Sequence, residues 1–439
     1  MSSYQRKQSP GNTDWFVNDR FGMFIHFGLY SLAARHEWVM SKEAVPEEKY
    51  KRYTKYFDPD MFNADEWAQY AENAGMKYAV LTTRHHEGFA LFDTKYSDYK
   101  ITNTPFGRDL VKEYCDAFRA HGLKVGFYYS LLDWQHPDYT IDRFHPRRFD
   151  ADAVEQNEKR DMHKYAEYMR NQLRELMTNY GKIDILWLDF SVKGDENSDN
   201  PVKRKGKGPE DWEAEKLLAL VRELQPGIII NHRTGIEQDF STPEQYQPDA
   251  WPRDEKTGEL LTWETCQTFS GSWGYYRDEQ TWKTPQMLIE MLIKTVSLGG
   301  NLIMNVGPCA RGYIDKRATD MLDAYGKWMK YNSRSIYGCT MAEPEFVAPF
   351  GTLLTQSNDG KRLYIHLVSY PFKSLKFTGL AGKVEYAQFL HDASEILFTE
   401  DAHGATDHLT MSQGVGDLVF DIPVVRPDVT VPVIEVFLK

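Results

Sequence analysis

The run D-I-L-W-L-D-F, residues 184–190, is a short apolar stretch that ends in the carboxylate of Asp189. A run of this length bounded by polar residues predicts a buried strand of a parallel sheet. No helix begins promptly in the residues that follow, S-V-K-G-D-E-N-S. We therefore interpret Asp189 as a nucleophile or base, and not as a helix cap or a structural ion pair.

Six further runs share this design of an apolar stretch followed by polar or ionisable side chains. They are GMFIHFG from Gly22, YAVLTT from Tyr78, VGFYYS from Val125, GIIINH from Gly227, LTWETC from Leu261 and NLIMNVGP from Asn301. Amphipathic segments with a 3.6-residue period separate most of them, and several stop at a glycine, as a helix C-cap requires. This alternation predicts a (β/α)8-like TIM barrel, in which the carboxyl ends of all strands open on one face where catalytic groups gather.

The pattern changes after about Tyr337, where short β-rich runs separated by turn-forming residues replace the helices. We predict a (β/α)8-like catalytic domain over residues 1–337 and a C-terminal β-sandwich domain over residues 338–439. Two domains suit this chain of 439 residues, because single cores stop growing at about 250–300 residues. The long polar stretches 191–213 and 235–258 follow barrel strands and should shape the entrance to the pocket.

Composition excludes several function classes. A formal net charge of −12 argues against nucleic acid and membrane partners, since both need a basic face. The four cysteines form no CxxC pair, and we interpret them as free thiols. No nucleotide-binding glycine motif and no GxSxG motif are found, so we expect no cofactor. The first residues lack the apolar core of a signal peptide, which predicts a cytoplasmic location.

A second carboxylate, Glu264 in TWETC, is also expected at a strand end. Two carboxylates at the rim of a barrel are the minimum equipment of a glycoside hydrolase, because one attacks or activates water and the other protonates the leaving oxygen. Glu244 in STPEQY is an alternative to Glu264 for the second role, and Glu37 is a more distant one.

Histidines and tryptophans gather in the same motifs. We interpret His26, His85 and His86 as ligands of sugar hydroxyls, and a metal site built from them is the less favoured alternative. Indole faces stack well on the apolar C–H faces of a pyranose, so a pocket lined by tryptophans suits a carbohydrate. The tryptophans in or beside the motifs are Trp15, Trp38, Trp134, Trp187, Trp263 and Trp273.

Taken together, the motifs resemble the α-L-fucosidases of glycoside hydrolase family 29. They run in order from Trp15 to Tyr337 as W-F-x-x-x-R-F-G-M-F-I-H-F-G, H-E-W, R-H-H-E-G-F, Y-Y-S-x-x-D-W, L-W-L-D, W-E-T-C, S-W-G-Y and T-V-S-L-G-G-N-L-I-M-N-V-G-P. The resemblance implies a retaining exo-α-L-fucosidase that releases terminal α-L-fucose from oligosaccharides or glycoconjugates. Related alternatives are a retaining hydrolase of an L-galactose-like sugar and a non-catalytic carbohydrate-binding protein.

The resemblance also implies roles for individual residues. Asp189 would be the nucleophile that forms a covalent fucosyl-enzyme, and Glu264 would be the general acid/base. Tyr128 is preferred to Tyr129 as a sugar ligand, because strand alternation turns only one of them inward. No metal is implied. The substrate-binding set is His26, Glu37, Trp38, His85, His86, Tyr128, Trp187, Arg233 and Trp273.

The chain departs from the family pattern at two places. It has Arg84-His85-His86-Glu87 where Lys-His-His-Asp is frequent, and Phe190 follows the presumed nucleophile where glycine is common. Both departures leave the presumed sugar contacts in place.

Overall fold

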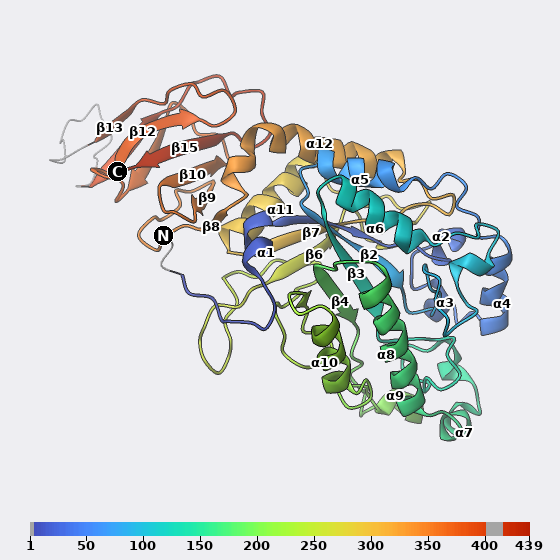
Figure 1. Cartoon of the computed structure of the whole chain (residues 1–439). Coiled ribbons are helices and arrows are strands. Elements are labelled where there is room, and N and C mark those ends of the chain that lie inside the picture. The colour runs from blue at the N-terminus through green and yellow to red at the C-terminus, as the bar shows by residue number, and fades with distance from the viewer. Residues whose placement is uncertain (1–3, 401–415) are drawn as a thin grey trace.

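A sheet of parallel strands forms the larger body of the protein. The structure is a computed structural model that describes residues 4–400 and 416–439. Seven strands lie in the order β5-β4-β3-β2-β1-β7-β6 (Figure 1). They are β1 (Phe21–Ile25), β2 (Tyr78–Arg84), β3 (Lys124–Ser130), β4 (Ile185–Asp189), β5 (Ile229–Ile230), β6 (Glu264–Thr268) and β7 (Asn301–Val306). Each run predicted from the sequence overlaps one of these strands.

A short irregular segment, residues 240–245, closes the barrel between the edge strands β5 and β6. Parallel bridges join Asn231, next to β5, to Phe240 and join Glu244 to Cys266 of β6. Backbone hydrogen bonds of 2.9–3.1 Å link the segment to β6 and to the residues just before it. The segment takes the place of an eighth strand, although the sequence predicts a polar loop there.

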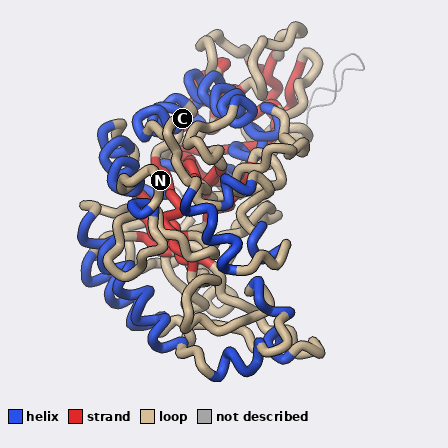
Figure 2. The backbone as a smooth tube through the Cα atoms, turned by 90° about the vertical axis from the view of Figure 1, so that its right-hand side faces the viewer, coloured by secondary structure: helices blue, strands red, loops and turns tan. Residues whose placement is uncertain are grey.

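Helices cover the outer side of this sheet, and Figure 2 shows the strands at the centre with helices around them. Their apolar faces supply the main core, while N-caps such as Asn63 and Asp109 begin α5 and α6. The helices are α1 (Asp14–Asp19), α2 (Tyr30–Ala33), α3 (Val39–Lys42), α4 (Glu47–Lys51), α5 (Ala64–Asn73), α6 (Leu110–Ala120), α7 (Ala153–Glu158), α8 (Met162–Asn179), α9 (Pro201–Arg204), α10 (Ala214–Leu224), α11 (Pro285–Ser297) and α12 (Lys316–Asn332), with 3-10 turns η1 (Arg52–Lys55), η2 (Ile101–Asn103), η3 (Pro146–Phe149) and η4 (Ser333–Ser335).

Two antiparallel sheets form the C-terminal part, with strand orders β12-β15-β10-β9-β8 and β11-β14-β13. Apolar side chains of both sheets, Ile365 and Phe377 among them, share one core, as in a β-sandwich. Helix α11 packs against β8 and β9 and joins the two parts (Figure 1). The strands are β8 (Cys339–Met341), β9 (Thr352–Ser357), β10 (Arg362–Leu367), β11 (Ser374–Thr378), β12 (Val384–Phe389), β13 (Phe398–Glu400), β14 (Asp417–Asp421) and β15 (Val433–Leu438).

The cysteines, the absence of a membrane-spanning helix, the domain boundary and the location were further expectations from the sequence. All four cysteines are buried and free, as predicted. Among residues 4–400 and 416–439, no helix has the length and apolar character needed to span a membrane. The division at residues 337 and 338 and the cytoplasmic location stay predictions.

The interior of β3 leaves no room for a side chain at Gly126. A Cβ atom there would lie 2.3 Å from Cγ2 of Ile185 and 2.9 Å from Cγ2 of Val80. We predict that Gly126→Ala lowers the stability by about 1–3 kcal/mol because the barrel interior is overpacked. Gly208→Ala, where a Cβ meets nothing within 4 Å, is the matched control. Thermal unfolding followed by circular dichroism measures both, and equal Tm values would contradict the packing argument.

Candidate active site

Asp189 is the last residue of β4, and its carboxylate is held by donors from two other strand ends. The Tyr128 hydroxyl donates to Oδ2 at 2.7 Å, and Nη1 of Arg233 contacts Oδ1 at 2.7 Å. The residue is buried and lines the pocket. One oxygen is thus anchored from β3 and the other from the loop after β5, which fixes the orientation of the carboxylate.

The residue after Asp189 adopts a backbone conformation that favours glycine. Phe190 has φ of 86°, in the left-handed region, which costs a non-glycine residue about 1–2 kcal/mol. Its ring packs against Trp38, His86 and Phe144, with centroid distances of 5.3, 5.4 and 5.1 Å. This aromatic packing offsets the backbone strain and turns the chain away from the strand directly after the carboxylate.

A single guanidinium connects Asp189 to a second carboxylate, Glu244. Nη1 of Arg233 contacts Asp189 at 2.7 Å, and Nη2 contacts Oε2 of Glu244 at 2.8 Å. Nε donates to the Thr242 hydroxyl at 2.8 Å, which fixes the plane of the guanidinium. The Glu244 side chain is 42 % exposed, whereas that of Asp189 is 9 % exposed. The two carboxylates therefore lie in one site with very different access to water.

One pocket at the carboxyl ends of the strands collects most of the predicted residues. Tyr128 lines it, whereas the Tyr129 hydroxyl donates to Gln172 instead. Glu244, Phe190, Phe24 and Cys266 complete the lining. The predicted residues found there are His26, Glu37, Trp38, His85, His86, Tyr128, Trp187, Asp189, Arg233 and Trp273.

Hydrogen bonds from Nδ1 fix the tautomer of two pocket histidines, His26 and His86. Nδ1 of His26 lies 2.6 Å from the amide oxygen of Asn305, which only accepts, so Nδ1 carries the proton. Nδ1 of His86 lies 2.7 Å from the Ser130 hydroxyl, whose own proton goes to the Leu132 carbonyl. Burial first, and then the charge of His85, lowers the pKa of both rings well below the ordinary value. Each ring is therefore neutral, with Nε2 left as an acceptor for a hydroxyl donor.

Two further pocket residues tie the surrounding loops together. Oε2 of Glu37 accepts the backbone N–H of Gly274 at 2.8 Å, which joins the H-E-W motif to the S-W-G-Y motif. The ring of His85 stacks on Tyr128 at 5.4 Å with an interplanar angle of 13°. Both contacts hold residues of the pocket wall in place.

Glu264 lies outside this pocket. It is the first residue of β6, not the last, because the strand runs Glu264–Thr268 and not Leu261–Cys266 as the apolar run suggested. Cys266, two residues further along the strand, lines the pocket, so the backbone of Glu264 lies roughly 7 Å deeper along β6. It is fully buried, and it accepts hydrogen bonds from the Tyr78 hydroxyl and from Nε1 of Trp187, the latter at 3.0 Å.

The electrostatics of Glu264 and its geometry point in opposite directions. Burial raises the pKa of its carboxyl to about 8, against lowering by the hydrogen bonds from Tyr78 and Trp187. A raised pKa suits a general acid. A proton donor must also come within hydrogen-bond reach of the leaving oxygen, and Glu264 is fully buried and does not line the pocket. Its carboxyl group accepts a hydrogen bond from the indole of Trp187, which does line the pocket.

Two residues that support the site from behind had no role assigned from the sequence. Asn305 is the polar residue near the end of the run NLIMNVGP, and Ser130 ends the run VGFYYS, so their places near strand ends were the available signal. Glu244 was named only as an alternative, because nothing in the polar stretch between β5 and β6 marks residues 240–245 as the segment that replaces an eighth strand. Among the residues that the structure describes, no group of three His, Cys, Asp or Glu side chains is arranged to hold a metal ion.

Comparison with known proteins identifies close relatives. A family model described as alpha-L-fucosidase matches residues 2–334. The plasma alpha-L-fucosidase of Homo sapiens is 31% identical over 371 residues, which cover 76% of this chain and 70% of the human protein.

Solved structures agree over nearly the whole length. The alpha-L-fucosidase isoenzyme 1 from Paenibacillus thiaminolyticus is 41% identical, with a TM-score of 0.87 over 97% of this chain and 98% of that one. An alpha-L-fucosidase from Bacteroides thetaiotaomicron, trapped as a covalent intermediate with 2-fluoro-fucosyl fluoride in a Glu→Gln variant, is 28% identical, with a TM-score of 0.79 over 100% of this chain and 99% of that one.

The raised pKa of Glu264 makes stability depend on pH. The folded protein keeps this proton up to about pH 8, whereas the ordinary pKa is 4.5. The contribution of the protonated Glu264 carboxyl to the free energy of unfolding is therefore fully present below about pH 4.5 and is lost as the pH rises through about 8. We predict that Glu264→Gln, which is neutral throughout, gains stability relative to the wild type by on the order of 3–5 kcal/mol between pH 5 and pH 9. Urea unfolding at each pH measures this, and parallel curves for the two proteins would show that Glu264 is ionised in the fold.

Proposed function

Because the chain belongs to the alpha-L-fucosidase family, we propose that Asp189 and Glu244 perform the chemistry of a retaining exo-α-L-fucosidase. The observation that carries this assignment is the Arg233 guanidinium, which contacts both carboxylates in one pocket. Retaining enzymes hold their two carboxyl groups about 5–5.5 Å apart, so the proposal requires that spacing between Asp189 and Glu244.

In the first step, an oxygen of Asp189 attacks C1 of the fucosyl residue while Glu244 gives its proton to the glycosidic oxygen. The bond from C1 to that oxygen breaks, and a covalent fucosyl-enzyme with inverted configuration forms. In the second step, Glu244 takes a proton from water, which attacks C1 and releases Asp189. Two inversions give net retention, and Glu244 ends protonated as it began.

Arg233 suits both steps because one of its partners carries a negative charge in each state. Before attack the charge lies on Asp189, and in the fucosyl-enzyme Asp189 is an uncharged ester while Glu244 is a carboxylate. The guanidinium therefore never faces the site without an anionic partner. Placing a fixed positive group where charge moves lowers the cost of moving it.

The pocket also suits a single terminal sugar. Neutral His26 and His86 accept hydroxyl protons, and Trp187 and Trp273 offer faces for apolar C–H groups. Aromatic residues close its wall at Trp38 and Phe190. We propose terminal α-L-fucose of oligosaccharides or glycoconjugates as the substrate, with the exposed Glu244 on the side of the leaving group.

We prefer Glu244 to Glu264 as the acid/base because a substrate in the pocket can reach it. Glu244 lines the pocket and is partly exposed, while Glu264 is sealed below Trp187. The trapped intermediate of the Bacteroides relative was obtained in a Glu→Gln variant, which supports a glutamate as the second catalytic residue.

The nucleophile is tested with p-nitrophenyl α-L-fucoside. We predict that Asp189→Gly lowers kcat by at least about 10³-fold, because the covalent step is lost. Added azide should restore turnover and form β-L-fucosyl azide, since a single displacement inverts C1. Rescue with the α-azide, or activity close to that of the wild type, would place the nucleophile elsewhere.

The acid/base is tested by a matched pair of variants. Glu244→Ala should lower kcat/KM by about 10²–10⁴-fold on a fucosyl disaccharide and much less on an aryl fucoside, whose leaving group needs no proton. Azide should then give α-L-fucosyl azide, because it attacks the fucosyl-enzyme already formed on Asp189. Glu264→Gln is the control and should keep kcat within about tenfold of the wild type. Loss of activity in Glu264→Gln together with α-azide formation in Glu264→Ala would reverse the assignment.

A further inference from the structure

Glu87 is a buried carboxylate to which the catalytic steps assign no role. It follows β2, two residues after His85, and it is 1% exposed. Its Oε2 atom has no hydrogen-bond partner among the described residues. A buried carboxylate is costly unless a partner satisfies it, so an unpartnered one calls for an explanation.

The ring of His85 offers the missing partner. Its Nδ1 atom lies 3.6 Å from Oε2 of Glu87 and, like that oxygen, is buried without a hydrogen bond in the described structure. A protonated Nδ1 donates and a carboxylate oxygen only accepts, so the two atoms are complementary. The distance is slightly longer than a hydrogen bond, and such contacts at catalytic sites often tighten only when substrate binds. The pair is therefore placed to form a hydrogen bond in the substrate complex.

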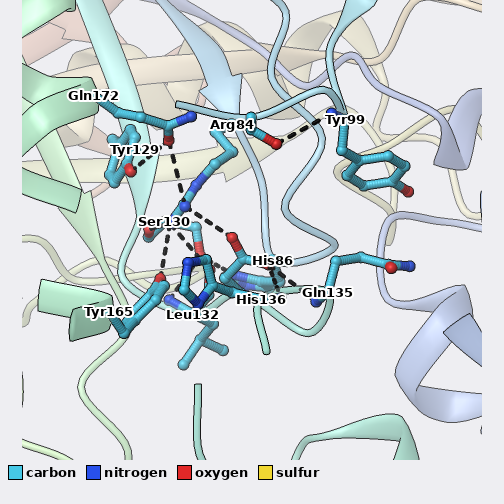
Figure 3. Close-up of polar contacts among 12 residues, drawn as sticks. Arg84, His86, Tyr99, Tyr129, Ser130, Leu132, Gln135, His136, Tyr165 and Gln172 are labelled. Atoms are coloured by element: carbon cyan, nitrogen blue, oxygen red, sulfur yellow. Dashed lines mark hydrogen bonds and ion pairs between the residues drawn. The ribbon is translucent and has the colours of Figure 1, made fainter. Parts of the chain in front are cut away.

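The other two pocket histidines already have support at Nδ1. His26 is bonded there to the amide oxygen of Asn305 at 2.6 Å. His86 is bonded there to the Ser130 hydroxyl at 2.7 Å. Ser130 is held in turn, because its carbonyl accepts a hydrogen bond from Nη2 of Arg84 at 2.7 Å (Figure 3). The third histidine differs from these two because its Nδ1 faces a carboxylate.

Three buried tyrosines also lie near Glu87, and they do not neutralise its charge. Burial first, and then the charge of Glu87, raises the pKa of the Tyr30, Tyr50 and Tyr99 hydroxyls well above the ordinary value, so they stay neutral. None of these hydroxyls is hydrogen-bonded to Glu87 in the described structure. Of the ion pairs within residues 4–400 and 416–439, only the one with His85 includes Glu87.

The placement of His85 matters to more than one contact of the site. The ring lines the pocket and stacks on Tyr128 at 5.4 Å with an interplanar angle of 13°. The Tyr128 hydroxyl in turn donates to Asp189. A shift of the His85 ring would therefore disturb both a wall of the pocket and the residue that anchors the nucleophile.

We propose that Glu87 is a positioning residue for the reaction. Its carboxylate accepts the Nδ1 proton of His85 when substrate binds, which fixes the ring and leaves Nε2 for a sugar hydroxyl. Glu87 does not line the pocket, so it acts on the sugar through His85. This role rests on the proposed function, because it requires a fucosyl group in the pocket.

A double-mutant cycle on the hydrolysis of p-nitrophenyl α-L-fucoside tests this role. Glu87→Leu removes the accepting oxygen and should lower kcat/KM by about 10–100-fold. Glu87→Gln keeps an accepting oxygen and should stay within about threefold of the wild type. In a His85→Ala background, Glu87→Leu should lower kcat/KM by no more than about threefold further, because its effect passes through that ring. Glu435→Gln changes a buried carboxylate of β15 and is the control, with kcat/KM unchanged.

Nitrogen-15 NMR of histidine-labelled protein reads the protonation of His85 directly, so the test does not depend on the folding of Glu87→Leu. The spectrum of His85→Ala assigns the ring signals. In the wild type saturated with L-fucose, Nδ1 of His85 should carry the proton.

Four results would overturn the inference. They are an Nδ1 of His85 without a proton in the fucose complex, wild-type kcat/KM in Glu87→Leu, a Glu87→Gln variant no more active than Glu87→Leu, and effects of Glu87→Leu and His85→Ala that multiply. Absence of aryl fucoside turnover in the wild type would instead contradict the proposed function on which the inference rests.

Discussion

The contact of one guanidinium with two carboxylates is the interaction on which the site depends. Arg233 contacts Asp189, which ends β4, and Glu244, which lies in the segment that closes the barrel. That geometry exists only because residues 240–245 bridge β5 and β6 in place of an eighth strand. Residues 240–245 form an irregular segment and not a regular barrel strand. In this segment the Glu244 side chain is 42 % exposed and lines the pocket. The segment that closes the barrel thus also carries the carboxylate that we propose as the acid/base.

The buried layer below the pocket explains why the upper residues hold their places. Glu264, Tyr78 and Trp187 form a bonded group inside the barrel, at the level where β6 begins. A carboxyl group that stays protonated is tolerated there because it is hydrogen-bonded and uncharged. Trp187 extends from this layer to the pocket, where Arg233 lies 5.1 Å from its ring. The position of Arg233 therefore depends on Trp187 and on the buried residues that hold it.

Much of the fold and part of the site could be predicted from the sequence, for identifiable physical reasons. Long apolar runs such as that ending at Asp189 have one stable environment, a strand buried on both faces, so their ends predict rim positions well. The run around Glu264 was misjudged because the apolar residues Leu261 and Trp263 precede the strand, and Trp263 packs with Trp251 and Leu260 in a separate cluster, while the strand itself, E-T-C-Q-T, is largely polar. Glu244 was not preferred as the acid/base because its segment shows no strand-like pattern of side chains. The segment is held beside β6 by backbone hydrogen bonds, which the sequence does not reveal. The support behind the histidines, from Asn305 and Ser130, depends on tertiary contacts that no local pattern encodes.

The most direct test of the account is to locate the covalent intermediate. The Glu244→Gln variant is treated with 2-deoxy-2-fluoro-L-fucosyl fluoride, digested, and the modified peptide is sequenced by mass spectrometry. A fluoride leaving group needs no proton, so label should accumulate on Asp189 and persist because no base remains to activate water. Label on any peptide that does not contain Asp189 would contradict the proposed mechanism. Loss of the label as fast as in the wild type would contradict it as well.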